Sequence, residues 1–461
     1  MTEKLGERTA MNEYYVFGNH AAASADPRML NGTVQKLWKS FCLTEGEISL
    51  SEGEACTFRM GDIPLPVLED GCEFAAAVDH TGAAVVGRDY GGLMRGYIAL
   101  LMRIEYTEPG FRIEKAEFRS AYRISKRMIH VCVFPDNDLY SIKKIVRLAG
   151  LCQYTHIVIE FWGMLKYDCL KELAWPSAFT KAQIADLIRE VREFGMEPIP
   201  MFNQLGHATA SRICHGKHVV LEQNPRLQNL FTPDGWAWNI GSEKVHALLK
   251  NVRTELYELF GEGEFMHIGC DEAYYYSHCD EERRRLPEFL RRLTDEVAAE
   301  GRRPMLWMDM LLERGKYPNA TASCAPEEVE ILQKSLNPAS VMVDWQYDTT
   351  QVPVQTLMSL KDSGHDVIGA PWYRRGNYSA CVNTVADHGM YGIMMTTWHA
   401  LGEQMSCILG CAKVCGATTF PWGRFSPELT ETATMLRRVS FEGNDYASSG
   451  WAKVDMVNFS F

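Results

Sequence analysis

The chain has 461 residues, of which 46% are apolar and 11% aromatic, ample for a buried core, so a disordered chain is excluded. Its net charge of −12 argues against a protein that binds nucleic acid or an anionic membrane. No apolar run is long enough to cross a membrane, and the first residues carry no apolar segment typical of a secretory signal. With 14 irregularly spaced cysteines, we expect reduced thiols and a cytoplasmic location.

Residues 1–118 are predicted to form a small α+β domain. Segments 63–70 (IPLPVLED) and 73–79 (EFAAAVD) are strand candidates, and 82–92 contains a strand and a glycine-rich turn. Residues 93–104 have apolar side chains at helical spacing. Nothing in this region has catalytic spacing, so we expect a packing module.

From about residue 119 the pattern changes to alternating apolar strands and helices. The strand candidates are 128–134, 155–161, 197–203, 264–270, 304–309, 340–345, 366–371 and 391–397. The helical stretches are 138–150, 180–194, 243–260, 281–300, 326–334, 352–362, 381–388 and 402–414. Eight such pairs predict a (β/α)8 TIM barrel over 119–425, followed by a tail, 426–461, that packs on the barrel. A doubly wound sheet is the alternative, but no phosphate-binding glycine loop follows an early strand.

In such a barrel the chemistry lies where the strands end. Carboxylates, histidines and aromatic residues gather at these predicted ends: Glu160, Trp162, His207, His267, Asp271, Glu272, Trp307, Asp309, Trp345, Tyr347, Tyr373 and Trp398. Aromatic walls with hydrogen-bonding carboxylates suit a sugar ring, which has apolar C–H faces and hydroxyl edges.

The adjacent pair Asp271-Glu272 is the most informative dipeptide. Neighbours in a strand point to opposite faces, so both can face the barrel mouth only if the backbone turns there. Two close carboxylates surrounded by aromatic residues should not both ionise, so we expect a protonated Glu272, a general acid, beside an ionised Asp271.

Several motifs resemble glycoside hydrolase family 20, the β-N-acetylhexosaminidases. Residues 267–272 (HIGCDE) match its H-x-G-x-D-E motif, and 200–207 (PMFNQLGH) are similar to its P-x-x-Q-T-F-G-H segment. Residues 307–309 and 396–398 resemble its W-x-D and T-T-W, and 73–104 resembles the α+β domain that precedes its barrel.

This resemblance implies a retaining exo-enzyme that removes terminal β-linked GlcNAc or GalNAc through an oxazoline, the substrate's acetamido oxygen being the nucleophile. Asp271 would orient the acetamido group, and Glu272 would act as acid and then base. Trp307, Trp345 and Trp398 should form the walls around the terminal sugar, outside the packed layers of the barrel. His207, His267 and Asp309 are further expected substrate-site residues.

Some positions depart from the family pattern. Arg127 remains as the candidate for gripping the sugar's 3- and 4-hydroxyls, although the usual R-G-x-x-x-D motif is incomplete, and Asn203 replaces a glutamine. Tyr347, favoured over Tyr373, would bond the acetamido carbonyl. Glu403 would bond a sugar hydroxyl or serve only as a first-turn helix carboxylate.

Two rival interpretations remain open. One is a carbohydrate-binding protein on the same fold that has lost activity. The other is a metal-dependent hydrolase using His207, His215 and His267, but these residues lack the spacing of a zinc site, so we expect no metal and no cofactor. The expected partner is a small-molecule or oligosaccharide substrate with a terminal N-acetylhexosamine, not nucleic acid or membrane. The oligomeric state is left open, a homodimer included.

Overall fold

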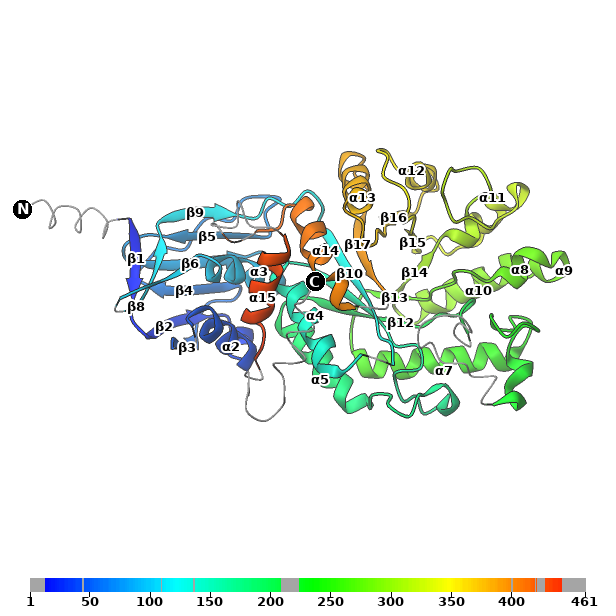
Figure 1. Ribbon diagram of the computed structural model, residues 1–461, viewed down its shortest axis with the longest axis horizontal. Coiled ribbons are helices and arrows are strands. Elements are labelled where there is room, and N and C mark those ends of the chain that lie inside the picture. Colours follow the sequence, from blue (N-terminus) through cyan, green and yellow to red (C-terminus); the bar gives the residue numbers. More distant parts are fainter. Residues whose placement is uncertain are drawn as a thin grey trace, which may run out of the picture.

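The computed structural model describes residues 13–43, 45–108, 110–135, 137–208, 224–398, 401–418, 420 and 428–441. An N-terminal sheet domain lies at one end of the molecule and a barrel with its helices at the other (Figure 1). The chain passes from the last strand of the first domain, which ends at Arg119, to the first barrel strand, which begins at Lys126.

Eight parallel strands form a closed barrel in chain order, as the sequence predicts. They are β10 (Lys126–Cys132), β11 (His156–Glu160), β12 (Glu197–Met201), β13 (Phe265–His267), β14 (Arg303–Trp307), β15 (Val341–Asp344), β16 (Asp366–Gly369) and β17 (Gly392–Thr397). Inward-facing apolar side chains such as Met128, Val158 and Phe265 fill the interior. Outward-facing ones such as Ile129 and Ile157 join the larger core beneath the helices. Burial of both faces explains the nearly continuous apolar runs.

Helices surround the barrel. They are α4 (Leu139–Leu151), α5 (Lys181–Glu193), α7 (Glu243–Phe260), the short α8 (Tyr274–His278) and α9 (Asp280–Arg283), α10 (Leu286–Ala299), α11 (Val329–Ser335), α12 (Gln355–Lys361), α13 (Arg375–Asp387) and α14 (Leu401–Val414). Local sequence sets several starts: Asp138 caps α4 by accepting from Ser141, and Thr180 with Gln183 forms a capping box on α5.

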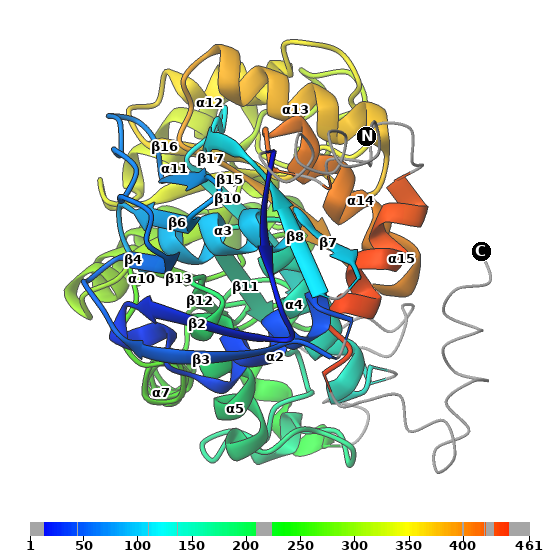
Figure 2. The same ribbon diagram turned by 90° about the vertical axis from the view of Figure 1, so that its left-hand side faces the viewer.

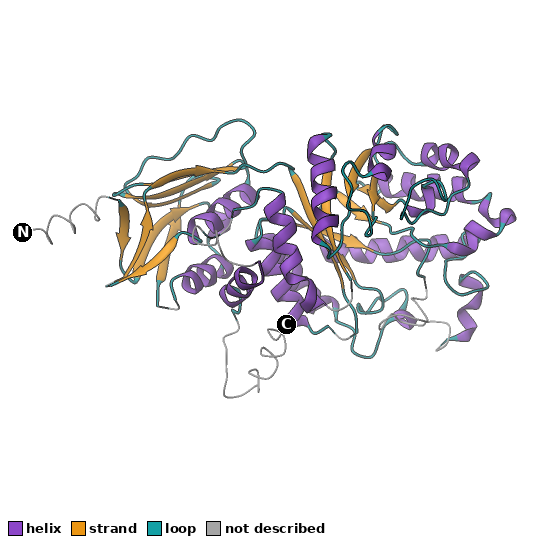
Figure 3. Cartoon of the chain, turned by 45° about the horizontal axis from the view of Figure 1, so that its top comes forward, coloured by secondary structure: helices purple, strands orange, loops and turns teal. Residues whose placement is uncertain are grey.

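The N-terminal domain contains a six-stranded sheet of order β3-β2-β4-β6-β5-β9 and a three-stranded sheet β1-β8-β7. The strands are β1 (Tyr14–Phe17), β2 (His20–Ala25), β3 (Glu47–Glu52), β4 (Thr57–Gly61), β5 (Phe74–Val78), β6 (Gly82–Gly87), β7 (Ile104–Thr107), β8 (Gly110–Glu114) and β9 (Ala116–Arg119). Helices α2 (Gly32–Phe41) and α3 (Tyr90–Leu101) lie between this domain's strands and the barrel, where they contact α5 and α4 (Figures 2 and 3).

One strand expected in this domain is absent. Residues 63–70 have no regular secondary structure. Pro64 and Pro66 remove two backbone N–H donors, so the segment cannot supply a full ladder of hydrogen bonds. The strands and helix before residue 61 were not predicted.

A buried ionic cluster joins the two domains. Arg127, in β10, donates to both carboxylate oxygens of Glu73, at 2.8 and 3.0 Å, and Arg95 of α3 donates to the same carboxylate. The Arg127 guanidinium also lies 3.5 Å from the ring centre of Tyr122. These contacts hold the N-terminal domain against the N-terminal end of β10, the first barrel strand.

The last described helix, α15 (Glu428–Arg438), contacts both domains. Glu431 pairs with Lys413 of α14, and Arg438 donates to the carbonyl of Ser40 in α2. The tail was expected to pack on the barrel, and its described helix contacts the barrel helices α14 and α4 as well as α2 of the N-terminal domain. Residues 442–461 lie outside the described part.

None of the described helices is both long and apolar enough to span a bilayer. The 13 cysteines within the described ranges are all free thiols. A cytoplasmic location stays a prediction.

Candidate active site

The backbone turns sharply after β13, and this turn creates the candidate site. Gly269, Cys270 and Glu272 all have left-handed φ angles, of 67°, 77° and 50°. A Cβ at Gly269 would collide with Asn203, so glycine is needed there for space as well as for φ. The turn ends β13 at His267, earlier than predicted, and carries both carboxylates of Asp271-Glu272 to the barrel mouth.

Strain of this kind is concentrated at the mouth. Trp162 and His207, which follow β11 and β12, are also left-handed, with φ of 46° and 52°. Such conformations cost free energy in non-glycine residues and tend to occur at functional sites. The neighbouring Gly206 packs so closely on the Asp271 carbonyl that no larger residue would fit.

His207 holds the two carboxylates together. Its Nε2 lies 3.2 Å from Asp271 Oδ2 and 3.0 Å from Glu272 Oε2. The other oxygen of Asp271 accepts from Asn203 Nδ2 at 2.5 Å, and the other oxygen of Glu272 accepts from the Tyr274 hydroxyl at 2.7 Å. Asp271 and His207 are buried, whereas the Glu272 side chain is 28% exposed.

The charge distribution differs from the expected one. Burial acts to raise the pKa of Glu272, but hydrogen bonds from His207 and Tyr274 and the charge of His207 outweigh it, so the pKa is lowered. The buried carboxyl whose pKa is raised well above its usual value is Asp309, because of desolvation and the charge of Asp271. The expectation of a protonated Glu272 is therefore wrong for the unliganded protein.

Asp309, the first residue of a 3₁₀ turn after β14, supports the backbone turn and one aromatic side chain of the site. Its oxygens accept from the backbone N–H of Glu272 at 2.9 Å and from Trp345 Nε1 at 3.2 Å. One carboxyl thus fixes both the turn that bears the acidic pair and one of the aromatic side chains.

The three predicted tryptophans are grouped, but not all as walls. Trp345 and Trp398 are partly buried and lie over the barrel interior, whereas Trp307 is fully buried among the interior side chains. The rings of Trp307 and Trp398 are 6.3 Å apart. Trp307 therefore belongs to the packed interior of the barrel, beneath the mouth, and its prediction as a wall outside the packed layers is wrong. The reason is that its side chain points inward at the last position of β14.

The two tyrosine candidates separate clearly. Tyr347 accepts from Trp398 Nε1 at 3.0 Å, and its pKa is raised, mainly by burial, with Asp271 and Glu272 contributing. Tyr373 is 40% exposed and is separated from Tyr347 by the ring of Trp372. Tyr347 is therefore the candidate in the mouth.

Arg127 does not reach the mouth, so its predicted substrate contact is wrong. It lies near the start of β10, 1% exposed, and its guanidinium is occupied by Glu73 and backbone carbonyls. The other end of that strand presents Cys132, which packs with Phe134, Trp162 and Trp398.

Two other predicted residues have altered placements. Glu403 is exposed on the first turn of α14, whereas its neighbour Gln404 is buried and bonds Trp372 Nε1 and the backbone of Trp398. His267 is fully buried, its Nδ1 accepts from Gly269 N–H, and burial lowers its pKa to about 3. His267 therefore supports the turn as a neutral ring.

Three residues that contact the site, Trp236, Tyr274 and His130, are absent from the predicted set. Trp236 donates to the Glu272 carbonyl at 2.7 Å and packs at a tilt against the His207 ring, and the Tyr274 hydroxyl donates to the Glu272 carboxylate. His130 and Glu160, at the ends of neighbouring strands, form a buried pair 3.1 Å apart. The predicted strand end already placed Glu160 at the mouth, whereas the loop residue Trp236 carried no signal beyond its residue type.

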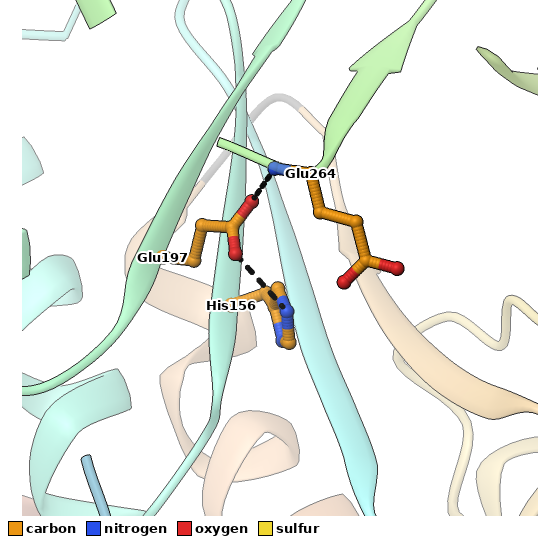
Figure 4. A group of neighbouring side chains, drawn as sticks. All are labelled: His156, Glu197 and Glu264. Atoms are coloured by element: carbon orange, nitrogen blue, oxygen red, sulfur yellow. Dashed lines mark hydrogen bonds and ion pairs between the residues drawn. The ribbon is translucent and has the colours of Figure 1, made fainter. Parts of the chain in front are cut away.

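Two groups within the described residues have the ligand atoms of a metal site close together. One is His207, Asp271 and Glu272. The other is His156, Glu197 and Glu264, at the end of the barrel where the strands begin, opposite the mouth (Figure 4). There Glu264 is already paired with Lys126 and Arg303, a basic setting that disfavours a bound cation. Of the rival metal set, His215 lies outside the described residues, and His267 accepts from Gly269 N–H through Nδ1, while its buried Nε2 has no hydrogen-bond partner within the described part of the chain.

The glycosyl hydrolase family 20 catalytic domain matches residues 163–406, slightly more than half of the chain. The chain therefore belongs to glycosyl hydrolase family 20, and it is a glycoside hydrolase.

Solved structures share its fold at low identity. They include the β-N-acetylhexosaminidase from Streptomyces coelicolor A3(2), at 16% identity and a TM-score of 0.67, covering 95% of each chain. Another is the exo β-N-acetylglucosaminidase from Vibrio harveyi in complex with N-acetylglucosamine, at 13% and 0.66, covering 94% of this chain and 75% of that one. The N-acetyl-β-hexosaminidase from Streptomyces plicatus matches at 14% and 0.65, covering 93% and 92%.

Proposed function

We propose that the protein is a retaining exo-β-N-acetylhexosaminidase that releases terminal β-linked GlcNAc or GalNAc by substrate-assisted catalysis. The observation that carries the proposal is the adjacent pair Asp271-Glu272 at one strand end, bridged by His207. Adjacent carboxylates can hardly straddle a glycosidic bond as the two carboxylates of an ordinary glycosidase do. If the substrate's own acetamido oxygen is the nucleophile, the protein needs no second carboxylate on the opposite side of the bond.

In the first step the acetamido oxygen attacks the anomeric carbon, and Glu272 protonates the leaving oxygen. Asp271, held by Asn203 and His207, orients the acetamido N–H and stabilises the positive charge that develops there. In the second step Glu272 takes a proton from water as the water attacks the oxazoline. Tyr347 is our candidate for the bond to the acetamido carbonyl.

Glu272 must gain a proton for the first step although its pKa is lowered in the unliganded protein. A bound sugar and its leaving group would exclude water from the mouth. Desolvation already acts to raise this pKa, and it would strengthen in the complex, favouring the acid form.

The test is the requirement for the 2-acetamido group. An aryl β-GlcNAc should be hydrolysed, whereas the matching aryl β-glucoside should be a very poor substrate, since it lacks the nucleophile and its effective molarity. A thiazoline analogue of the cyclised intermediate should bind far more tightly than substrate, and Asp271→Asn should weaken that binding.

Comparable turnover of the β-glucoside would contradict the mechanism, as would a covalent sugar trapped on a protein carboxylate. Tight sugar binding without any turnover would favour the rival carbohydrate-binding protein.

A further inference from the structure

Every polar group of Glu272 is engaged. Its N–H donates to Asp309, and its carbonyl accepts from Trp236 Nε1 and, at 2.8 Å, from the Tyr274 N–H. His207 holds one carboxylate oxygen and the Tyr274 hydroxyl holds the other. Tyr274 therefore contacts Glu272 twice, through its backbone and through its side chain.

The local backbone explains this double contact. Ala273, between the two residues, has φ −79° and ψ 61°, which is an inverse γ-turn closed by the bond from Tyr274 N–H to the Glu272 carbonyl. The turn brings the side chain of residue 274 back onto that of residue 272. The phenol then reaches Oε1 at 2.7 Å.

The two partners contact different oxygens of the carboxylate and differ in exposure. His207 is buried, at 7% exposure, whereas Tyr274 is 38% exposed. The Tyr274 hydroxyl is therefore the more solvent-accessible of the two groups that hold the Glu272 carboxylate.

We propose that Tyr274 is a positioning residue for the acid and base Glu272, and this proposal rests on the proposed function. Its hydroxyl fixes the rotamer of the carboxylate and stabilises the charged form, which favours the base step and opposes the acid step. Tyr274 keeps its own proton throughout, because burial and the Glu272 carboxylate raise its pKa. The proton transferred in each step is the one that Glu272 gives to the leaving oxygen or takes from water.

The pH dependence follows from the groups that face Glu272, namely His207, Asp271, Asp309 and Tyr274. Tyr274→Phe removes a hydrogen bond that stabilises the carboxylate, so the pKa of Glu272 should rise. Because the acid form is needed for bond cleavage, activity falls as pH rises through that pKa. The alkaline limb of kcat/KM should therefore move upward by about 0.5–1 pH unit.

The experiment compares pH profiles of kcat/KM for wild type, Tyr274→Phe and Tyr275→Phe, using an aryl β-GlcNAc. Tyr275 is the matched control, since it is the next residue in the same helix and has no described contact with Glu272. The upward shift is expected in Tyr274→Phe only. Superimposable profiles, or an equal loss at every pH, would overturn the proposal.

A second measurement keeps this test separate from the proposed function. Carbon-13 NMR of labelled glutamate carboxyls, with Glu272→Gln identifying the signal, follows the titration of Glu272 without any substrate. Tyr274→Phe should raise its midpoint. An unchanged midpoint would overturn the role of Tyr274, even if the enzyme proved inactive on N-acetylhexosamines.

Discussion

Replacing Arg127 by methionine tests whether this arginine holds the domains together rather than a sugar. The change removes two hydrogen bonds to Glu73, three to backbone carbonyls and the contact with Tyr122, while methionine fills similar space. Breaking one side of a buried ion pair costs about 3–5 kcal/mol. Glu73 retains Arg95 and its side chain is 20% exposed, so we expect the lower end, about 3 kcal/mol.

The assay is the midpoint of urea unfolding together with steady-state kinetics of the folded fraction. Arg112→Met, which removes an exposed pair with Glu105, is the control and should cost no more than about 1 kcal/mol. KM of Arg127→Met should stay within about twofold of wild type, since a residue outside the pocket contributes no substrate binding.

The stability difference should also depend on pH. Burial opposes ionisation of Glu73, but Arg127 and Arg95 outweigh it and lower its pKa in the folded protein. The stabilisation is therefore present above the unfolded pKa of about 4.3 and is lost as pH falls through the lower, folded value. A large rise in KM with unchanged stability would refute this reasoning and return Arg127 to the sugar site.

Three further predictions concern the mouth. Glu272→Gln should slow cleavage of a poor leaving group by ~10²–10⁴ but affect a dinitrophenyl glycoside much less, and equal losses would argue against a general acid. Gly206→Ala should abolish most activity because its Cβ would displace the Asp271 backbone, whereas Gly18→Ala, with open space around it, should be neutral in the same activity and melting assays. Trp307→Ala should lower the free energy of unfolding by about 3–5 kcal/mol, because Trp307 is fully buried. Trp345 is only partly buried, so Trp345→Ala should mainly raise KM. A Trp307→Ala variant as stable as wild type would contradict the buried position of Trp307.

Much of the fold could be predicted because each part leaves a local pattern. Strands buried on both faces are continuously apolar, and their alternation with amphipathic helices specifies a parallel barrel. The mouth could also be predicted, since parallel strands all end at the same rim. Asp271, Glu272, His207 and Tyr347 were found in this way.

What the sequence could not reveal depends on partners distant along the chain. Arg127 and Glu73 lie 54 positions apart, and only the docking of two domains makes that arginine structural. The protonation pattern likewise needed the tertiary structure, because the pKa of a carboxyl depends on its burial and on which charges and donors face it. Sequence alone identified the acidic pair at the barrel rim. The tertiary contacts with His207 and Tyr274 lower the pKa of Glu272, whereas burial beside Asp271 raises that of Asp309.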